Sequence, residues 1–193
     1  MKTVKVWDLS VRIFHWTLAL LVGAAFLTGD DETMPWHVRG GIVIAGLLVY
    51  RVIWGFVGPE QARFRTFLRG PRAVLQYLRA YVRGRPPLHL SHNPLGAVMV
   101  VMLLAVLFGA VITGGLAYSS AEWDGPLSAF IGEGLGHDLE EVHEGLANAL
   151  LFLVPAHVIG VIVSSFLERQ NLVKGMIIGR KKAVDVEEVA PRS

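Results

Sequence analysis

Histidine is the residue type in this sequence with the clearest capacity for chemistry, because a neutral imidazole binds metal ions. The 193 residues include seven histidines and no cysteine. Four histidines lie within or at the ends of long apolar stretches: His15, His37, His143 and His157. A single buried histidine often does no more than hydrogen-bond a neighbouring carbonyl, but ionisable residues inside membranes are costly and tend to be functional.

The spacing of His143 and His157 argues for a functional role. These residues are 14 positions apart. On one helix, they project within roughly 40° of each other and lie about 21 Å apart along the axis. One metal centre cannot touch both at that separation. Each therefore needs a partner of its own, at its own depth, on another helix.

Four apolar stretches can supply such helices, since crossing a hydrocarbon core takes roughly 20 helical residues. They cover residues 11–28, 37–56, 95–116 and 142–167. The composition is 53% hydrophobic, which points to lipid rather than to a water-soluble core. The first stretch is expected to be a retained span, because residues 28–31 offer no small-residue cleavage site. The predicted fold class is all-α, an integral membrane four-helix bundle that forms a single domain over residues 1–193.

The charged residues predict the orientation of these spans. Of 18 Lys and Arg residues, all but Arg39 fall on one side of the four-span arrangement. That side carries Lys2, Lys5, Arg12, Arg51, Arg63, Arg65, Arg69, Arg72, Arg79, Arg83, Arg85, Arg169, Lys174, Arg180, Lys181, Lys182 and Arg192. The opposite loops carry Asp30, Asp31, Glu32, Glu122, Asp124, Glu133, Asp138, Glu140 and Glu141. Positive residues resist translocation, so both termini and the central loop are expected in the cytoplasm. The basic residues then form a collar at the membrane surface, and no nucleic-acid partner is predicted.

The central cytoplasmic loop contains an amphipathic segment at residues 71–83. Helical spacing places one set of apolar residues on one face: Val74, Leu75, Leu78, Tyr81 and Val82. Three arginines supply the polar flank: Arg72, Arg79 and Arg83. The pattern predicts a short interfacial helix lying on anionic membrane lipid. The alternative is a basic loop with incidental apolar residues. Asn93 and Pro94 then predict the cap and first turn of the third span.

The predicted depth of each histidine in the membrane indicates which histidines form pairs. His37 opens the second span at the level of His143, and His15 lies nearest the level of His157. Two imidazoles from two helices suit haem iron, which takes axial ligands on opposite faces of a flat macrocycle. Covalent c-type haem and thiolate iron–sulfur clusters are excluded, because both require cysteine. A zinc or copper site is the alternative, above all beside His143, where acidic residues cluster at Glu140, Glu141 and Glu144.

Two arginines lie close in sequence to these histidines. Arg39 follows His37 by two residues, against the charge bias of its side, and is predicted to bind an outer haem propionate. Pairing with the acidic run at residues 30–32 is the alternative. Arg12 precedes His15 by three residues and is predicted to bind a propionate of the inner haem. The alternative is that its side chain extends (snorkels) to the lipid headgroups. The other histidines, His89, His92 and His137, are expected at the surface, although His92 could face the edge of the inner haem.

Several sequence motifs resemble those of bacterial cytochrome b561-type proteins, including the b-type cytochrome subunits of nickel–iron hydrogenases. They are residues 6–16 (VWDLSVRIFHW), 36–41 (WHVRGG), 51–55 (RVIWG) and 92–97 (HNPLGA), followed by a last helix with His143, Asn148 and residues 156–158 (AHV). The resemblance implies a four-helix bundle with two haems b, the inner one ligated by His15 and His157 and the outer one by His37 and His143. Hydrogenase-type subunits usually carry a further transmembrane helix, so four spans favour the compact, stand-alone group.

The sequence therefore predicts an electron-transfer cytochrome in the bacterial cytoplasmic (inner) membrane. Its two haems are expected to carry electrons between the quinone pool and a periplasmic partner, such as a c-type cytochrome or another redox subunit that docks on the acidic loops. No quinone-site motif is evident. One alternative is a superoxide:quinone oxidoreductase, although an acidic outer face repels superoxide. Others, from different classes, are a metal- or ion-handling membrane protein and a plain membrane anchor.

Overall fold

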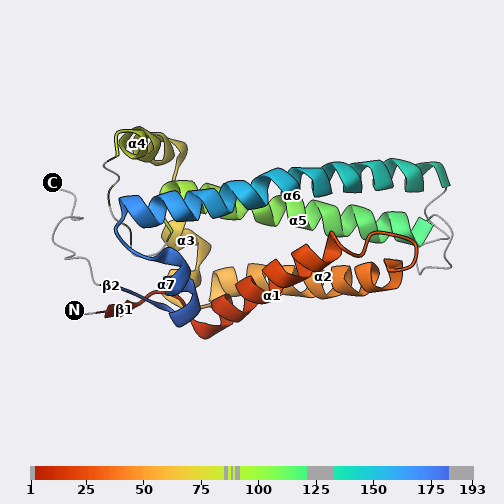
Figure 1. Ribbon diagram of the computed structural model, residues 1–193, viewed down its shortest axis with the longest axis horizontal. Helices are drawn as coiled ribbons and strands as arrows, with labels where there is room; N and C mark the ends of the chain where they lie inside the picture. The colour runs from red at the N-terminus through yellow and green to blue at the C-terminus, as the bar shows by residue number, and fades with distance from the viewer. Residues whose placement is uncertain (1–2, 85–86, 88, 90–91, 121–132, 183–193) are drawn as a thin grey trace. The chain divides into compact units, whose positions relative to one another are not determined.

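The computed structural model describes residues 3–84, 87, 89, 92–120 and 133–182, and most of them are helical (Figure 1). The longer helices are α1 (Leu9–Ala25), α2 (Met34–Val57), α4 (Pro71–Val82), α5 (Pro94–Ser120) and α6 (Glu133–Leu167). The shorter elements are η1 (Glu60–Ala62), α3 (Phe64–Phe67), α7 (Leu172–Ile178), β1 (Thr3–Lys5) and β2 (Arg180–Lys182). The chain forms two compact units: unit 1 comprises residues 1–15, 51–101 and 155–193, and unit 2 comprises residues 16–50 and 102–154.

Three described helices are long and apolar enough to cross a membrane: α2, α5 and α6. Helix α1 has 17 residues and is also apolar, at the lower end of the length that spans a bilayer. Large apolar side chains on these helices are exposed, with Leu20 of α1 at 75% and Phe152 of α6 at 78%. Such surfaces are typical of helices that face lipid. The all-α membrane class is confirmed, whereas α1 as a fourth span stays a prediction.

Helix α6 is longer than the sequence predicted. It begins at Glu133 rather than near residue 142, so His137, Asp138 and Glu140 lie on the helix and not in a loop. No proline interrupts this stretch, and carboxylates in the first turns interact favourably with the positive end of the helix dipole. Glu122 and Asp124 of the predicted acidic loop lie outside the described residues.

Two local predictions in unit 1 are confirmed. The predicted helix in segment 71–83 is α4, which covers Pro71–Val82 with Pro71 at its first position; its place on the lipid stays a prediction. Helix α5 begins at Pro94, and the Gly96 backbone N–H donates to the Asn93 side chain over 2.8 Å. Asn93 is therefore the cap of α5, because its side-chain oxygen accepts from one of the otherwise unpaired amides of the first turn.

The sequence did not predict the small sheet of unit 1. Strands β1 and β2 pair antiparallel, with Val4 opposite Lys181. The backbone N–H groups of Val6 and Trp7 both donate to the Gly179 carbonyl, over 2.9 and 3.2 Å. Gly179 ends α7 with a φ of 77°, and a Cβ there would lie 2.7 Å from the Trp7 carbonyl oxygen. Glycine is thus required by both conformation and space. Residues 180–182 are ordered by a strand from the other end of the chain.

Each unit has its own buried cluster. In unit 1, Val6, Trp7, Val11 and Ala62 pack together against Trp54 and Met176. In unit 2, four residues of α2, α5 and α6 form the corresponding cluster: Ile44, Leu48, Leu107 and Leu150. These clusters position the helix segments that carry the histidines, since interlocking side chains restrict how a helix can rotate about its axis.

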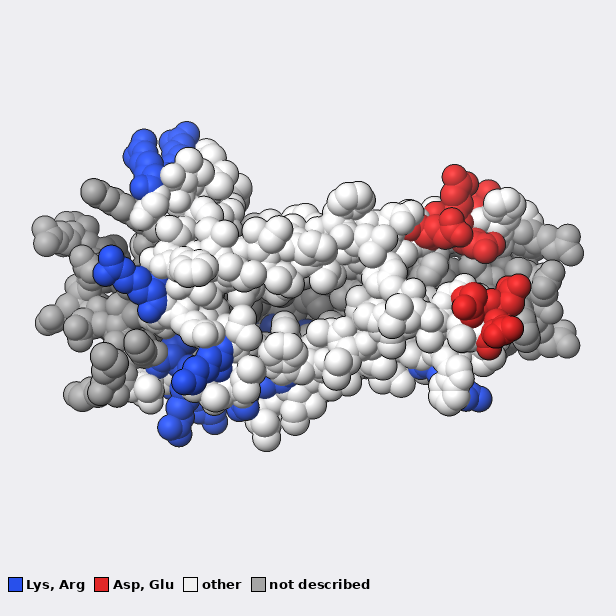
Figure 2. Space-filling view, viewed as in Figure 1, with Lys and Arg blue, Asp and Glu red and all other residues white. Residues whose placement is uncertain are grey.

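The two units differ in the sign of the charged side chains that gather on them. Figure 2 shows Lys and Arg side chains gathered over the elements of unit 1, whereas Asp and Glu gather on unit 2 beside the α1–α2 connection and the first turns of α6. The exposed carboxylates on unit 2 are those of Asp30, Asp31, Glu32, Asp138, Glu140, Glu141 and Glu144. This segregation is the pattern on which the predicted membrane orientation rests.

Candidate functional site

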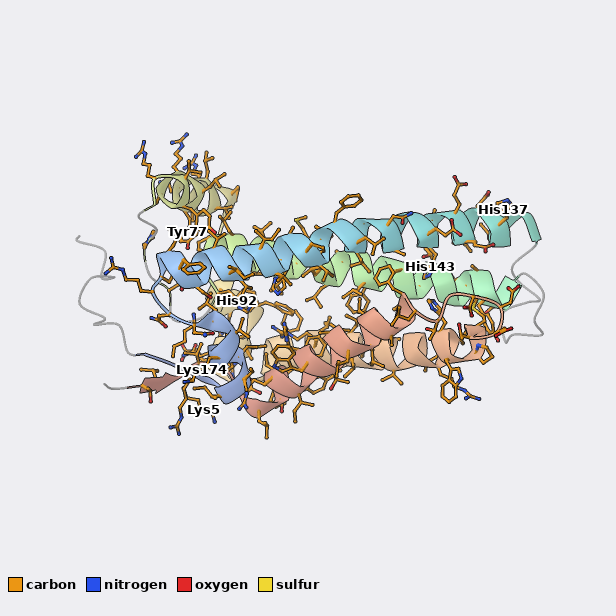
Figure 3. The ribbon with its side chains drawn as sticks, viewed as in Figure 1. Lys5, Tyr77, His92, His137, His143 and Lys174 are labelled. Carbon is orange, nitrogen blue, oxygen red and sulfur yellow. The ribbon has the colours of Figure 1, made fainter. Side chains whose placement is uncertain are left out.

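In unit 2 the structure brings His37 of α2 and His143 of α6 together. Their ring centroids are 6.0 Å apart and their planes are inclined at 83°. His143 comes from a helix that begins 76 residues after the end of α2, so the contact depends on tertiary packing. Figure 3 labels His143 among the side chains between the helices of this unit.

The hydrogen bonds of these two rings determine which nitrogen is available to a metal. His37 Nδ1 lies 3.0 Å from the carbonyl oxygen of Ala25, and His143 Nδ1 lies 2.8 Å from that of Ala110. A carbonyl only accepts hydrogen bonds, so both Nδ1 atoms must carry the proton. In a neutral ring Nε2 then has the free lone pair. Metal-binding histidines in proteins usually have this arrangement, with a carbonyl or carboxylate holding the other nitrogen.

A glycine on α5 makes room for His143. A Cβ at Gly114 would lie 2.7 Å from Nδ1 and 2.8 Å from Cε1 of His143, closer than real Cβ contacts. The next residue, Gly115, has open space where a Cβ would be added. Only the first of the two glycines is therefore required by the histidine. Sequence reasoning missed Gly114, whose partner lies on another helix.

A cavity of about 410 Å³ adjoins His37 in unit 2. It is lined mainly by apolar residues of α1 and α2, together with His37, Arg39 and Gly40. The Arg39 guanidinium lies 5.0 Å from the centre of the Trp36 ring, and in the described part of the chain it makes no ion pair with residues 30–32. An apolar wall with one histidine and one arginine suits a flat apolar ligand that bears carboxylates.

In unit 1 the structure brings His15 of α1 and His157 of α6 together. Their ring centroids are 6.3 Å apart and their planes are inclined at 53°. Both side chains are half-buried. A Cβ at Gly160, one turn after His157, would meet no atom within 4 Å. The two pairs predicted from depth are thus the two pairs that lie in contact.

His92 is more enclosed than a surface histidine. Its ring lies between Trp7 and Phe67, with centroid distances of 4.7 and 4.6 Å. Its Nδ1 is buried without a hydrogen-bond partner among the described residues. Burial, together with the nearby cations Arg51 and Lys181, lowers the pKa of His92 to about 3. The ring is therefore neutral at physiological pH. His89 is also half-buried, against Tyr77, and so the expectation of surface positions holds only for His137.

Unit 1 also contains buried charged residues that the sequence did not single out. Arg51 and Lys181 are buried, and so is Glu168, whose Oε1 accepts a hydrogen bond from Asn93 Nδ2 over 3.1 Å. Arg51 also donates to the Ala62 carbonyl. In the sequence, the signal for this buried group was Arg51 in the RVIWG motif. From the sequence alone, Arg51 was interpreted only as a positive charge at the end of a span.

Arg12 has a structural contact in unit 1. Its guanidinium donates to the Ile177 carbonyl, at the end of α7. This bond connects the first turn of α1 to the C-terminal part of the chain. Whether Arg12 also binds a propionate stays a prediction. The alternative, in which Arg12 extends to the lipid headgroups, did not include the bond to Ile177.

The geometry of both pairs fits a haem iron held between two imidazoles. An imidazole nitrogen binds a metal at about 2 Å and lies about 1 Å from its own ring centre, so two rings on opposite sides of one iron have centroids about 6 Å apart. The observed values are 6.0 and 6.3 Å. No group of three or more His, Asp or Glu residues suited to a metal ion occurs in the described ranges. Structural zinc prefers four such ligands.

Comparisons with known proteins agree on one family. The family described as prokaryotic cytochrome b561 matches residues 6–179. A protein of Bradyrhizobium diazoefficiens named as a probable Ni/Fe-hydrogenase B-type cytochrome subunit is 25% identical, over 95% of this chain and 87% of its own length. Proteins with the same name from Rhizobium leguminosarum and Rhodobacter capsulatus are 25% and 24% identical, over 97% and 95% of this chain and 92% and 83% of their own lengths.

Proposed function

The chain belongs to the prokaryotic cytochrome b561 family, and from this premise we propose that it holds two haems b, one at each histidine pair. The family is one of b-type cytochromes for membrane electron transfer, which makes the chain an integral membrane protein that uses haem b. The observation that supports two sites is the pair of centroid distances, 6.0 Å for His37–His143 and 6.3 Å for His15–His157.

The residues of each site hold and orient the group. When bound, haem b supplies an iron that accepts and releases single electrons. His37 and His143 present Nε2 because backbone carbonyls hold their Nδ1 protons. Arg39 lines the same cavity as His37 and is proposed to bind a propionate of the outer haem. His15 and His157 are proposed as the ligands of the inner haem.

We propose four membrane spans, with α1 as the fourth, in a bundle whose termini and α4 face the cytoplasm of a bacterial inner membrane. The charge distribution supports this orientation, since basic residues gather on unit 1 and carboxylates on unit 2. The acidic surface of unit 2 would then face the periplasm. A redox partner with a basic face would be attracted to it by long-range electrostatics.

Electrons are proposed to pass between the quinone pool and that periplasmic partner. The names of the relatives favour a hydrogenase as the partner, although four predicted spans had favoured a stand-alone cytochrome. A soluble c-type cytochrome is the second candidate, and the exposed carboxylates of α6 are its proposed docking residues. Superoxide as a substrate is disfavoured because the same carboxylates repel an anion.

Haem content is the direct test of this proposal. We expect two haems b per chain, both low-spin, because each pair offers two imidazoles and no third ligand. A pyridine haemochrome assay combined with protein quantitation measures the ratio, and the reduced-minus-oxidised spectrum reports the spin state. A preparation without haem would contradict electron transfer and favour the metal-handling or anchor alternatives. A ratio near one would remove one of the two sites.

Reporter fusions test the proposed orientation. A reporter at Gly84 or at the C-terminus should be active only on the cytoplasmic side, and one at Gly134 only on the periplasmic side. The reason is that the positive residues of unit 1 resist translocation. Fusions at Gly84 and Gly134 that report the same compartment would contradict the four-span topology. The reverse of the expected pattern would invert the assignment of inner and outer haem.

A further inference from the structure

Helix α4 of unit 1 has three distinct faces, whereas the sequence predicted two. One face packs against the protein through Tyr77, which is only 3% exposed. The Tyr77 ring contacts those of Tyr81 and His89, with centroid distances of 6.1 and 5.3 Å. Val74 is half-buried on the same side. Two of the residues predicted for a single apolar face, Val74 and Tyr81, are therefore half-buried.

A second face of α4 is apolar and exposed. Leu75, Leu78 and Val82 are 48%, 41% and 78% exposed. Their spacing of three and four residues places them in one row on the helix. Nothing in the described part of the protein covers this row. An exposed row of this kind on a helix of a membrane protein calls for an apolar neighbour.

The third face of α4 is basic. Arg72, Gln76, Arg79 and Arg83 follow one another at helical spacing, next to the apolar row. No Asp or Glu occurs in the sequence between Glu60 and Glu122, so the helix and its flanks supply no counter-charge of their own. Figure 2 shows a group of Lys or Arg side chains over α4. We call Arg72, Arg79 and Arg83 the basic ridge of α4. A partner that neutralises this ridge must bring negative charge from outside the segment.

Helix α4 lies close to the start of α5 and the end of α6 in unit 1. Its anchor Tyr77 contacts His89, shortly before α5 begins at Pro94. Burial and the Glu168 carboxylate raise the pKa of the Tyr77 hydroxyl, and Glu168 is the residue that follows the end of α6. In Figure 1, α4 is seen nearly end-on, whereas the unit 1 parts of α5 and α6 run across the view. Figure 3 labels Tyr77 close to the end of α6.

We propose that α4 is a docking helix for anionic phospholipids of the membrane that the chain spans. Leu75, Leu78 and Val82 enter the acyl-chain boundary, and Arg72, Arg79 and Arg83 bind the phosphates. Apolar contact and charge attraction act together at such sites, and each basic residue near an anionic surface adds to binding. Tyr77 holds the helix to unit 1 with the other two faces turned outward. The proposal goes beyond the electron-transfer function and does not depend on haem.

The absence of native cysteine allows a direct test on the full-length, haem-loaded chain. A nitroxide is attached to Leu78→Cys in one variant and to Gln76→Cys in another, as the matched control two residues away on the basic face. Each protein is placed in nanodiscs of phosphatidylglycerol or of phosphatidylcholine. Collision with oxygen, which concentrates in acyl chains, is compared with collision with a water-soluble nickel chelate.

In phosphatidylglycerol we expect the oxygen-to-nickel collision ratio at position 78 to exceed that at position 76 severalfold. In phosphatidylcholine the ratio at position 78 should fall. The triple change Arg72→Gln, Arg79→Gln and Arg83→Gln should abolish that difference between lipids. The triple change Lys5→Gln, Lys174→Gln and Arg180→Gln, which removes equal charge elsewhere in unit 1, should preserve it. Unchanged haem content and circular dichroism establish that each variant folds.

Three results would overturn the proposal. A label at position 78 that meets the nickel chelate freely in both lipids places the row in water. A label shielded from both reagents means that protein covers the row. Equal burial in both lipids means that the basic ridge does not select anionic headgroups.

Discussion

His37→Ala and His143→Ala are expected to abolish the low-spin signature of the same haem and to leave the other haem intact. His15→Ala and His157→Ala should together define that second haem. The reason is that each iron needs two imidazoles, and the ring contacts join His37 to His143 and His15 to His157. Losing one ligand leaves the iron five-coordinate or water-bound, so a high-spin signal replaces the low-spin one even where haem is retained.

Redox titration of the four variants, monitored by visible and electron paramagnetic resonance spectra, measures which potential each substitution removes. Substitution of His92, which is enclosed by Trp7 and Phe67 but belongs to neither pair, is the control and should keep two low-spin haems. If His37→Ala and His157→Ala affect one haem while His15→Ala and His143→Ala affect the other, the assignment is wrong. If His37→Ala changes neither haem, its role as a ligand fails.

Gly114→Ala should damage the outer site, whereas Gly115→Ala should not. A Cβ at Gly114 would press on His143 at 2.7 Å, and that ring cannot easily move because Ala110 holds its Nδ1. Forcing an extra methyl group into packed surroundings costs about 1–3 kcal/mol, which the ring avoids only by leaving its position. A Cβ at Gly115 meets open space. Alanine is favoured over glycine within a helix by about 1 kcal/mol, so the second variant should be neutral or stabilised.

The measurements are the fraction of outer haem that stays low-spin and the thermal midpoint of each variant. We expect Gly114→Ala to lose most of the outer low-spin signal while the inner haem is unchanged. Gly115→Ala should match the unmodified protein in its spectrum and equal or exceed its midpoint. An intact outer haem in Gly114→Ala would mean that His143 lies elsewhere when haem is bound. Equal damage in both variants would point to α5 itself rather than to the histidine.

Much of the helical fold followed from local features of the sequence. Long apolar runs must be helical in lipid, because only a helix pairs all of its own backbone groups there. The start of α5 was predictable from Asn93 and Pro94, since capping involves residues three positions apart. The N-terminal extension of α6 was not, because acidic residues before an apolar run are equally typical of a loop. Depth along a span, which is a matter of counting residues, sufficed to propose the pairing of the four histidines.

The sequence by itself determined most of the long helices, because helix formation depends on neighbours within a few positions. Tertiary structure alone decided what each side chain touches. The backbone carbonyls of Ala25 and Ala110 hold His37 and His143. Because every residue has a backbone carbonyl, these contacts cannot be recognised from the sequence. Gly114 matters and Gly115 does not, because the rotation of α5 about its axis turns only one of them toward His143. That rotation results from packing between helices far apart in the chain, and the pairing of β1 with β2 depends on contacts of the same long-range kind.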